Sequence, residues 1–354
     1  MKTKNLKSVI MLTAALAMTA SVLFTACKKD EPSSGGGTQP ETSSYWSDSY
    51  RQNQLNGKVK TVKTYNEGPD EYLPADDGYH YGYLEFDQAG NLLKRGRIYP
   101  NQSDIYYGYI YSYDSQNRVI KASDVSGDRV NYEVEYGYDG SHHFYLPTNY
   151  LELMNLDITN LRMQKGLTSF KLTRGTSVLL DANCKTVTSN HLTFDATAGG
   201  IFATLVGNID KVDVDFIGNY PVGIKFMEGN TVNGSVDVTL GSDGMPAKLS
   251  YSIPALKAPV SIEYTAIAGF LLVTRMTTFD NSPYPGYGVL KYSDKGFPVS
   301  AIVYDNNGVK LRESTCTYEG YDSYGNWLKS TGVNKDYENA DTTTTISTRE
   351  FTYW

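Results

Sequence analysis

Apolar and polar residues alternate one by one along much of the chain. Val130, Tyr132, Val134 and Tyr136 share one face of such a segment, and the residues between them are Asn, Glu and Glu. A period of two residues is typical of a β-strand that buries one face. A long apolar stripe with the helical period of 3.6 residues is missing from the sequence. The pattern therefore predicts an all-β protein made of antiparallel strands.

Five stretches of the chain share a short motif. In each, an aromatic residue, usually followed by Asp, precedes two or three polar or small residues, a Gly or Asn, and a return to apolar residues. The Asp carboxylate can accept backbone N–H groups just ahead of it, and Gly or Asn can adopt the positive φ of a short hairpin loop. The motif therefore predicts five hairpins, at Phe86–Leu92, Tyr113–Val119, Tyr292–Pro298, Tyr304–Val309 and Tyr321–Trp327.

The distribution of this motif divides the chain into parts. The motif occurs within 45–145 and 281–354, whereas 146–280 lacks it. We expect an N-terminal β meander over 45–145, a central β segment over 146–280 and a C-terminal β meander over 281–354. In this arrangement antiparallel meander sheets flank the central segment and pair with it, and the two meanders share one sheet. Residues 149–164 fit either a strand pair or a short helix.

The repeated motif resembles the YD repeats of RHS-type proteins and of related Bacteroidetes surface lipoproteins, a family of unknown function. Its spacing here is irregular, because Asp87 and Asp114 are 27 residues apart but Asp305 and Asp322 are 17 apart. A regular solenoid keeps its period, so a closed RHS-type shell is not expected. The resemblance implies the strand topology and brings no catalytic residue with it.

The first 26 residues contain three Lys and then an uncharged, mostly apolar run, which is the layout of a secretory signal peptide. The segment Leu23–Cys27 resembles the bacterial lipoprotein cleavage box, in which a small residue precedes the Cys that receives acyl chains such as palmitate. We therefore predict a lipoprotein signal peptide over 1–26, lipidation of Cys27, and a flexible Gly- and Ser-rich tether over 27–44. An ordinary cleaved signal and a retained anchor helix are the alternatives.

The residues after Cys27 bear on location. No Asp follows Cys27 directly, and Lys28–Glu31 resembles the export tag of Bacteroidetes surface lipoproteins. The resemblance implies a lipid-anchored protein of the outer membrane, exposed at the cell surface and held to the membrane by its N-terminal lipid. Removal of 1–26, which contains three Lys and no acid, changes the net charge from −7 to −10. An acidic surface does not favour nucleic acid as a partner.

Tyrosine is unusually abundant, with 30 Tyr against 12 Phe. Several tyrosines line up on one face of neighbouring predicted strands. If exposed, such a row is a stacking platform for sugar rings or for a partner protein, and if covered it is part of the core. The candidate platform residues are Tyr81, Tyr83, Tyr107, Tyr109, Tyr111, Tyr113, Tyr132 and Tyr136.

Other candidate chemistry is sparse. After lipidation of Cys27, Cys184 and Cys316 remain, and they form either a disulfide in an oxidising compartment or two separate thiols. The four histidines lack the spacing of metal ligands, and the pair His142-His143 is expected on a surface loop. The sequence predicts no catalytic residue, no metal site and no cofactor.

These features favour a non-enzymatic cell-envelope lipoprotein that binds or scaffolds, with an envelope protein or a glycan as its partner. A carbohydrate-binding surface lipoprotein that uses the tyrosine platform is the first alternative. A glycan hydrolase, whose carboxylates meet only in the folded chain, is the lower alternative.

Overall fold

The computed structural model consists of antiparallel strands and one short helix in the part of the chain that it describes. That part comprises residues 55–67, 81–99, 102, 104–147, 161–217, 220–242, 244, 246–253, 260–267, 270–277 and 286–354. The predicted signal peptide over 1–26, the tether over 27–44 and the lipidation site Cys27 lie outside it. The prediction of an all-β, antiparallel fold is confirmed.

The chain divides into two compact units. Unit 1 contains the described residues up to Tyr106 and from Tyr264 onward, and unit 2 is Tyr107–Glu263. These limits differ from the expected ones, because the strands between 107 and 145 belong with those of the central segment. The predicted arrangement, in which end meanders flank the central segment and pair with it, is not the observed one, although strands from the two ends of the described chain do share one sheet.

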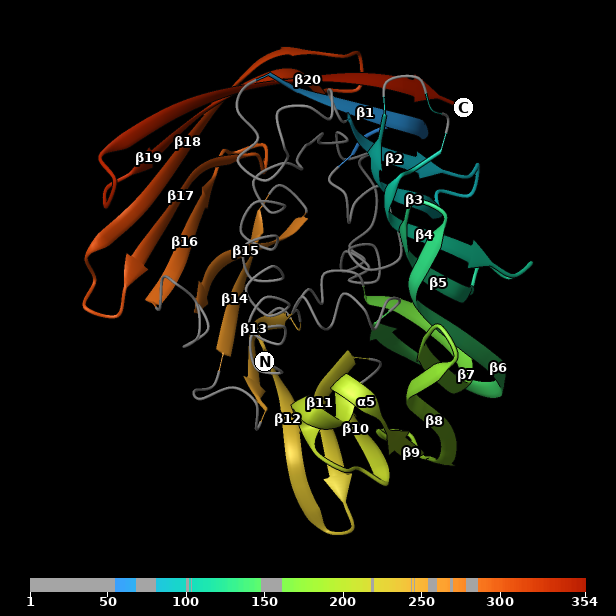
Figure 1. Ribbon diagram of the computed structural model, residues 1–354. Helices are drawn as coiled ribbons and strands as arrows, with labels where there is room; N and C mark the ends of the chain where they lie inside the picture. Colours follow the sequence, from blue (N-terminus) through green and yellow to red (C-terminus); the bar gives the residue numbers. More distant parts are fainter. Residues whose placement is uncertain are drawn as a thin grey trace, which may run out of the picture. The chain divides into compact units, whose positions relative to one another are not determined.

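Unit 1 joins the two ends of the described chain in one antiparallel ladder. Strand β1 (Val59–Glu67) lies between β2 (Tyr81–Phe86) and β20 (Asp341–Tyr353) and pairs with both, as the blue and red strands of Figure 1 show. The other strands of the unit pair with their neighbours in chain order: β3 (Leu92–Ile98), β15 (Phe270–Thr277), β16 (Gly286–Tyr292), β17 (Pro298–Asp305), β18 (Lys310–Tyr321) and β19 (Trp327–Asp336).

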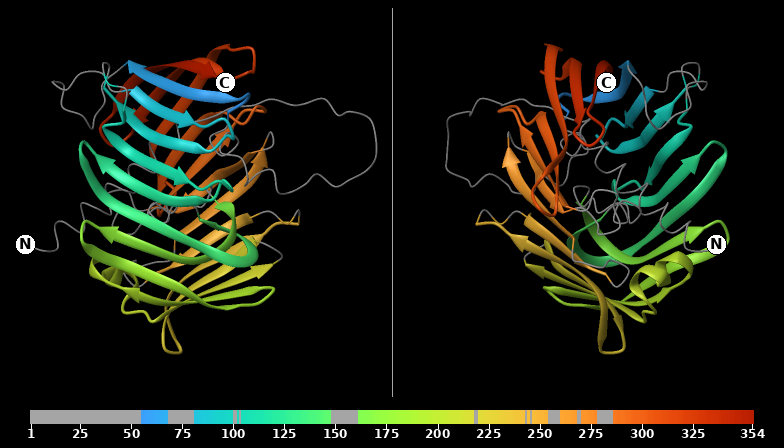
Figure 2. Two further views of the ribbon diagram at one scale, coloured as in Figure 1. Left: turned by 90° about the vertical axis from the view of Figure 1, so that its right-hand side faces the viewer. Right: turned by 60° about the vertical axis from the view of Figure 1, so that its left-hand side comes forward.

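Unit 2 is a second antiparallel ladder, in which each strand pairs with the next. The short helix α5 (Gly200–Val206) connects β9 to β10 and packs against β8 (Figure 2). No helix among the described residues has the length and hydropathy needed to span a membrane. The strands are β4 (Tyr107–Tyr113), β5 (Val119–Ser126), β6 (Arg129–Pro147), β7 (Leu161–Arg174), β8 (Ser177–Val187), β9 (His191–Ala198), β10 (Lys211–Ile217), β11 (Tyr220–Glu228), β12 (Thr231–Leu240), β13 (Pro246–Ser252) and β14 (Val260–Ile267), the last of which crosses the boundary between the units.

The five predicted hairpin loops are confirmed, and they share three hydrogen bonds. In the loop between β18 and β19, Asp322 Oδ1 accepts the backbone N–H of Asn326 at 2.9 Å. The backbone N–H of Asp322 donates to the Asn326 carbonyl, and the N–H of Gly325 donates to the Asp322 carbonyl. In one loop the Ser293 hydroxyl takes the place of the carboxylate. The residue with positive φ is, in turn, Gly90, Asn117, Gly296, Gly308 and Gly325.

The core of unit 2 consists of apolar rows that cross several strands. One row runs from β9 to β14 through directly paired residues, each at most 8% exposed, whereas the opposite face of the same strands is polar. A sheet that buries one face in this way needs the two-residue alternation read from the sequence. The row is Leu192, Val214, Ile224, Val236, Tyr251 and Val260.

Unit 1 buries polar side chains in addition to an apolar cluster of Leu272, Phe297 and Trp327. The fully buried Asn326 side chain donates to the Asn56 carbonyl, to Asp322 Oδ2 and to the Tyr353 hydroxyl. Asn56 donates its backbone N–H to Asn326 Oδ1 at 2.9 Å. This network ties the start of the described chain to its last strand. Near it, the guanidinium of the buried Arg349 lies 3.8 Å from the centre of the Trp327 ring.

Two local predictions, for the pair His142-His143 and for residues 149–164, are not confirmed in the way that the overall fold is. The pair His142-His143 was expected on a loop, but the backbone of both residues continues strand β6. Of the ambiguous segment 149–164, residues from Leu161 onward begin strand β7, and the residues before them lie outside the described part.

Candidate functional site

The predicted tyrosine platform divides into buried and accessible members. Tyr83, Tyr111 and Tyr136 are only 6–7% exposed, so these three rings belong to the core and cannot stack on a ligand. Tyr107 is 40% exposed. The remaining described rings, Tyr109, Tyr113 and Tyr132, are half-buried, and the side chain of Tyr81 lies outside the described part.

The members of the predicted platform also fall into different units. Tyr83 belongs to unit 1, where its hydroxyl donates to Glu85 Oε2 at 3.1 Å. Burial is the main reason why the pKa of Tyr83 is raised, with the Glu85 carboxylate adding to the effect. The tyrosines of β4 and β6 belong to unit 2 and share one face of its sheet, as the alternation predicts.

Three strands of unit 2 bring an acid between two half-buried tyrosines. Asp124 on β5 is the direct partner of Tyr109 on β4 and of Tyr132 on β6. Directly paired residues of antiparallel strands share one face, so the three side chains form a row across the sheet. At the end of the row the Arg174 guanidinium lies 5.4 Å from the centre of the Tyr132 ring.

The carboxyl group of Asp124 has an unusual environment. Burial raises its pKa to about 6, because removing water disfavours the charged form. A hydrogen bond from the Asn131 side chain opposes this shift but does not offset it. The row thus has an acidic group at its centre, flanked by tyrosine rings.

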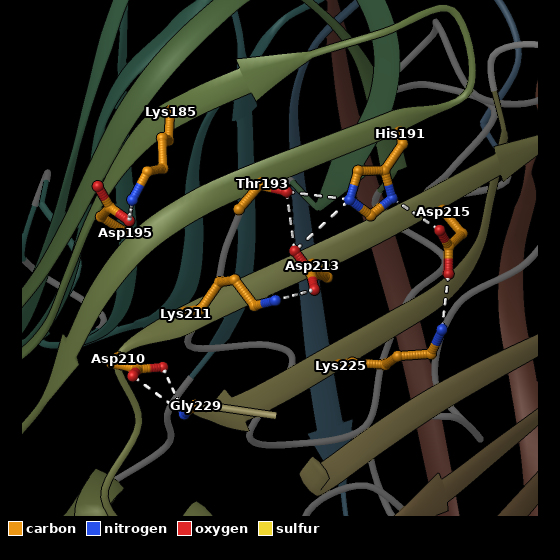
Figure 3. A network of polar contacts seen from close by, with 10 residues as sticks. All are labelled: Lys185, His191, Thr193, Asp195, Asp210, Lys211, Asp213, Asp215, Lys225 and Gly229. Carbon is orange, nitrogen blue, oxygen red and sulfur yellow. Dashed lines mark hydrogen bonds and ion pairs between the residues drawn. The ribbon is translucent and has the colours of Figure 1, made fainter. Parts of the chain in front are cut away.

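A polar network covers the other face of unit 2 (Figure 3). His191 Nδ1 lies 2.7 Å from Asp215 Oδ1, and His191 Nε2 lies 3.0 Å from the Thr193 hydroxyl. The Thr193 hydroxyl donates to Asp213 Oδ1 at 2.8 Å. Lys225 forms an ion pair with Asp215 at 2.9 Å. The network therefore extends over β9, β10 and β11.

The order of hydroxyl, imidazole and carboxylate in this network resembles the relay of a nucleophilic site. The geometry argues for a structural role instead, because the Thr193 hydroxyl donates its proton to Asp213. Register supports this interpretation, since Thr193 pairs with Asp213 and His191 pairs with Asp215 across β9 and β10. These are cross-strand pairs of the kind that stabilise a sheet.

Electrostatics fits the structural role of the network. Burial by itself would raise the pKa of Asp215, but hydrogen bonds from Lys225 and His191 outweigh it, so the pKa lies below its usual value. Asp215 therefore stays ionised and serves as an acceptor. Within the described part of the chain, no group of three or more His, Cys, Asp or Glu side chains is arranged to hold a metal ion.

The two candidate cysteines lie in different units and are both reduced, so the disulfide alternative is not realised in this structure. The Cys184 thiol contacts the Thr186 carbonyl, with 3.9 Å between sulfur and oxygen. Burial raises the pKa of the Cys316 thiol, although hydrogen bonds with Tyr318 and Ser330 act in the opposite direction. A thiol that keeps its proton is a poor nucleophile.

Comparison with known proteins gives only remote similarity. No protein-family model matches the sequence, and no curated protein matches it. Among solved structures, the crystal structure of TcdB2-TccC3-TEV contains a chain that is 10% identical to this one over 77% of this chain's length, with a TM-score of 0.33. This chain spans only 15% of the other chain. A porin-like protein from Bacteroides uniformis is 8% identical over 88% of this chain and all of the other, with a TM-score of 0.24. Similarity this low carries no argument about function.

The sequence pointed to several of these tyrosines but missed the acid between them. The alternation places Tyr109 and Tyr132 on apolar faces, whereas Asp124 has no motif of its own. The missing signal is the register, since only the pairing of β4, β5 and β6 brings Asp124 level with the two rings. The network around His191 was missed for the same reason.

Proposed function

We propose that this protein is a lipid-anchored component of the cell envelope that binds a partner without catalysing a reaction. The observation that carries the proposal is the less buried end of the tyrosine row on unit 2, where the exposed Tyr107 and the half-buried Tyr109 and Tyr132 accompany Asp124. Aromatic rings with polar tips, held on a rigid sheet, are suited to binding a partner because they lose little conformational freedom.

The anchor in this proposal is supported by the sequence around Cys27. Several acyl chains on that residue hold a protein at a bilayer far more firmly than one chain does. The tether over 27–44 separates the anchor from the described strands. The tag Lys28–Glu31 supports the outer membrane and the cell surface as the location, and the acidic net charge speaks against nucleic acid as the partner.

A binding role fits the chemistry of the site better than hydrolysis does. Glycoside hydrolysis uses two carboxyl groups that face each other across the substrate. The direct partners of Asp124 in the register are two tyrosines, not a second carboxylate. The acids Asp213 and Asp215 are already engaged with Lys, Thr and His side chains.

A photo-crosslinking amino acid in place of Tyr107, in cells that make the full chain, tests the binding role. We expect crosslinked adducts at this position in intact cells, whereas the same group in place of Tyr321, which is equally exposed in unit 1, gives few or none. Equal yields at the two positions, or no adducts at either, would contradict the proposal.

Cell fractionation tests the anchor separately. Cys27→Ser is expected to release the protein from the membrane fraction, because no residue remains to carry the lipid. Cys184→Ser is the matched control and is expected to stay with the membrane. Unchanged membrane partition of Cys27→Ser would rule out the lipid anchor.

A further inference from the structure

The accessible tyrosines belong to a row that combines stacking surfaces with hydrogen-bonding groups. Asp124 pairs directly with Tyr109 and Tyr132, and the Arg174 guanidinium lies 5.4 Å from the centre of the Tyr132 ring. Tyr107, two residues before Tyr109 on the same face of β4, is 40% exposed. The row thus offers three rings, a carboxyl group and a guanidinium on one side of the sheet.

The row has a closed end and an open end. Towards the middle of β4, Tyr111 is buried and pairs with Ala122, which is fully buried and pairs with the fully buried Val134. Towards the β5–β6 hairpin, Asp128 and Arg129 are exposed. The buried pairs fix the backbone, and Tyr107 and Asp124 lie at the less buried end of the row.

Asp124 occupies a position that disfavours its charged form. Burial disfavours this form, and a hydrogen bond from the Asn131 amide favours it without offsetting the burial. An Asn or Thr in the same place would avoid this cost. Side chains that reduce stability in this way cluster at functional sites. The position of Asp124 between two rings therefore points to a ligand that supplies hydrogen-bond donors.

We propose that the open end of this row binds a neutral saccharide, an inference that rests on the proposed binding function. The faces of sugar rings pack on Tyr107, Tyr109 and Tyr132, and sugar hydroxyl groups donate to the Asp124 carboxylate and bond to the Asn131 amide. An apolar protein surface would bury the carboxylate further and supply no donor besides the Asn131 amide, which is costly. A saccharide combines an apolar ring face with hydroxyl donors in one ligand.

The test is a binding measurement on the full chain, purified in detergent. The probes are neutral oligosaccharides of glucose, mannose, xylose and N-acetylglucosamine, first printed as an array and then titrated by calorimetry. We expect at least one of them to bind the unaltered protein. Asp124→Asn is expected to weaken that binding about tenfold or more, because a hydrogen bond to a charged group is lost. Tyr132→Ala and Tyr107→Ala are expected to weaken it at least fivefold.

Tyr321→Ala is the matched control, because Tyr321 has the same 40% exposure as Tyr107 but belongs to unit 1. Saccharide binding by Tyr321→Ala is expected to equal that of the unaltered protein. Thermal melting of each variant identifies any loss of folding. No binding to any probe, or an equal loss with Tyr321→Ala, would overturn the saccharide proposal. The crosslinking at position 107 is independent of these probes, so adducts with a protein there would leave the binding function standing while the saccharide proposal fails.

Discussion

Both units bury apolar side chains, but most of the buried polar side chains among the described residues belong to unit 1. Unit 2 is built on apolar rows such as the one from Leu192 to Val260, in which every member is buried. Unit 1 buries Asn326, Arg349 and several hydroxyl groups, and a network of hydrogen bonds ties Asn56 to the last strand. The difference shows that, in a sheet with the same alternating sequence pattern, a buried polar network can accompany the burial of apolar area.

The largest expected effect is in the apolar core of unit 2. Phe194 is 1% exposed, and its ring centre lies 5.5 Å from that of Phe170 in an edge-to-face arrangement. Phe194→Ala leaves a cavity and is expected to cost about 3–5 kcal/mol of unfolding free energy. Urea unfolding measures the cost, and hydrogen exchange shows whether β9 and β10 lose protection before β1 and β20. A cost below about 1 kcal/mol would mean that the apolar core is not the source of stability in unit 2.

The second prediction concerns the polar interior of unit 1. Asn326→Ala removes the group that bonds to Asn56, Asp322 and Tyr353 and leaves buried donors and acceptors unsatisfied, at an expected cost of about 2–3 kcal/mol. Hydrogen exchange is expected to report the loss at β1 and β20. Asn307→Ala is the control, because Asn307 occupies an exposed position in another of the five loops, and we expect it to cost less than about 0.5 kcal/mol. Equal costs for the two variants would show that the loops, not the network, stabilise the unit.

The third prediction uses pH to examine the acid in unit 2. The pKa of Asp124 is raised to about 6 in the folded chain, so the folded state holds its proton more tightly than the unfolded state does. The contribution of Asp124 to the free energy of unfolding is therefore fully present at low pH and is lost as the pH rises through about 6. Asp124→Asn removes this decline and is expected to stabilise the protein by about 1–2 kcal/mol at pH 8.

Urea unfolding at pH 4 and pH 8 measures the effect of Asp124→Asn. The two proteins are expected to converge near pH 4, where the native Asp124 is neutral. Asp181→Asn serves as the control, because Asp181 is an exposed acid on β8 that lies 3.7 Å from Lys171. A gain from Asp124→Asn that is the same at both pH values would mean that its charge is not the cause.

The sequence predicts the local structure of this protein well and its long-range pairing poorly. The five loops form as expected, because an Asp or Ser side chain and a Gly or Asn at a fixed distance determine a hairpin without help from the rest of the chain. The pairing of β1 with β20 joins residues almost 300 positions apart, and no local pattern contains that information. The position of Asp124 between two tyrosines depends on register in the same way.

The smallest expected effect lies on the exposed surfaces, where the two units should behave alike. Lys225 pairs with Asp215 at 2.9 Å in unit 2, and Lys329 pairs with Glu319 at 3.2 Å in unit 1, with all four side chains at least 40% exposed. Lys225→Met and Lys329→Met are each expected to cost about 0.2–1 kcal/mol, because water and salt screen such pairs. Urea unfolding at low and high salt measures both costs, which should shrink together as salt is added. A much larger cost for Lys225→Met would mean that the network around His191 stabilises unit 2 as strongly as its apolar rows do, and the contrast between the two interiors would no longer explain their stability.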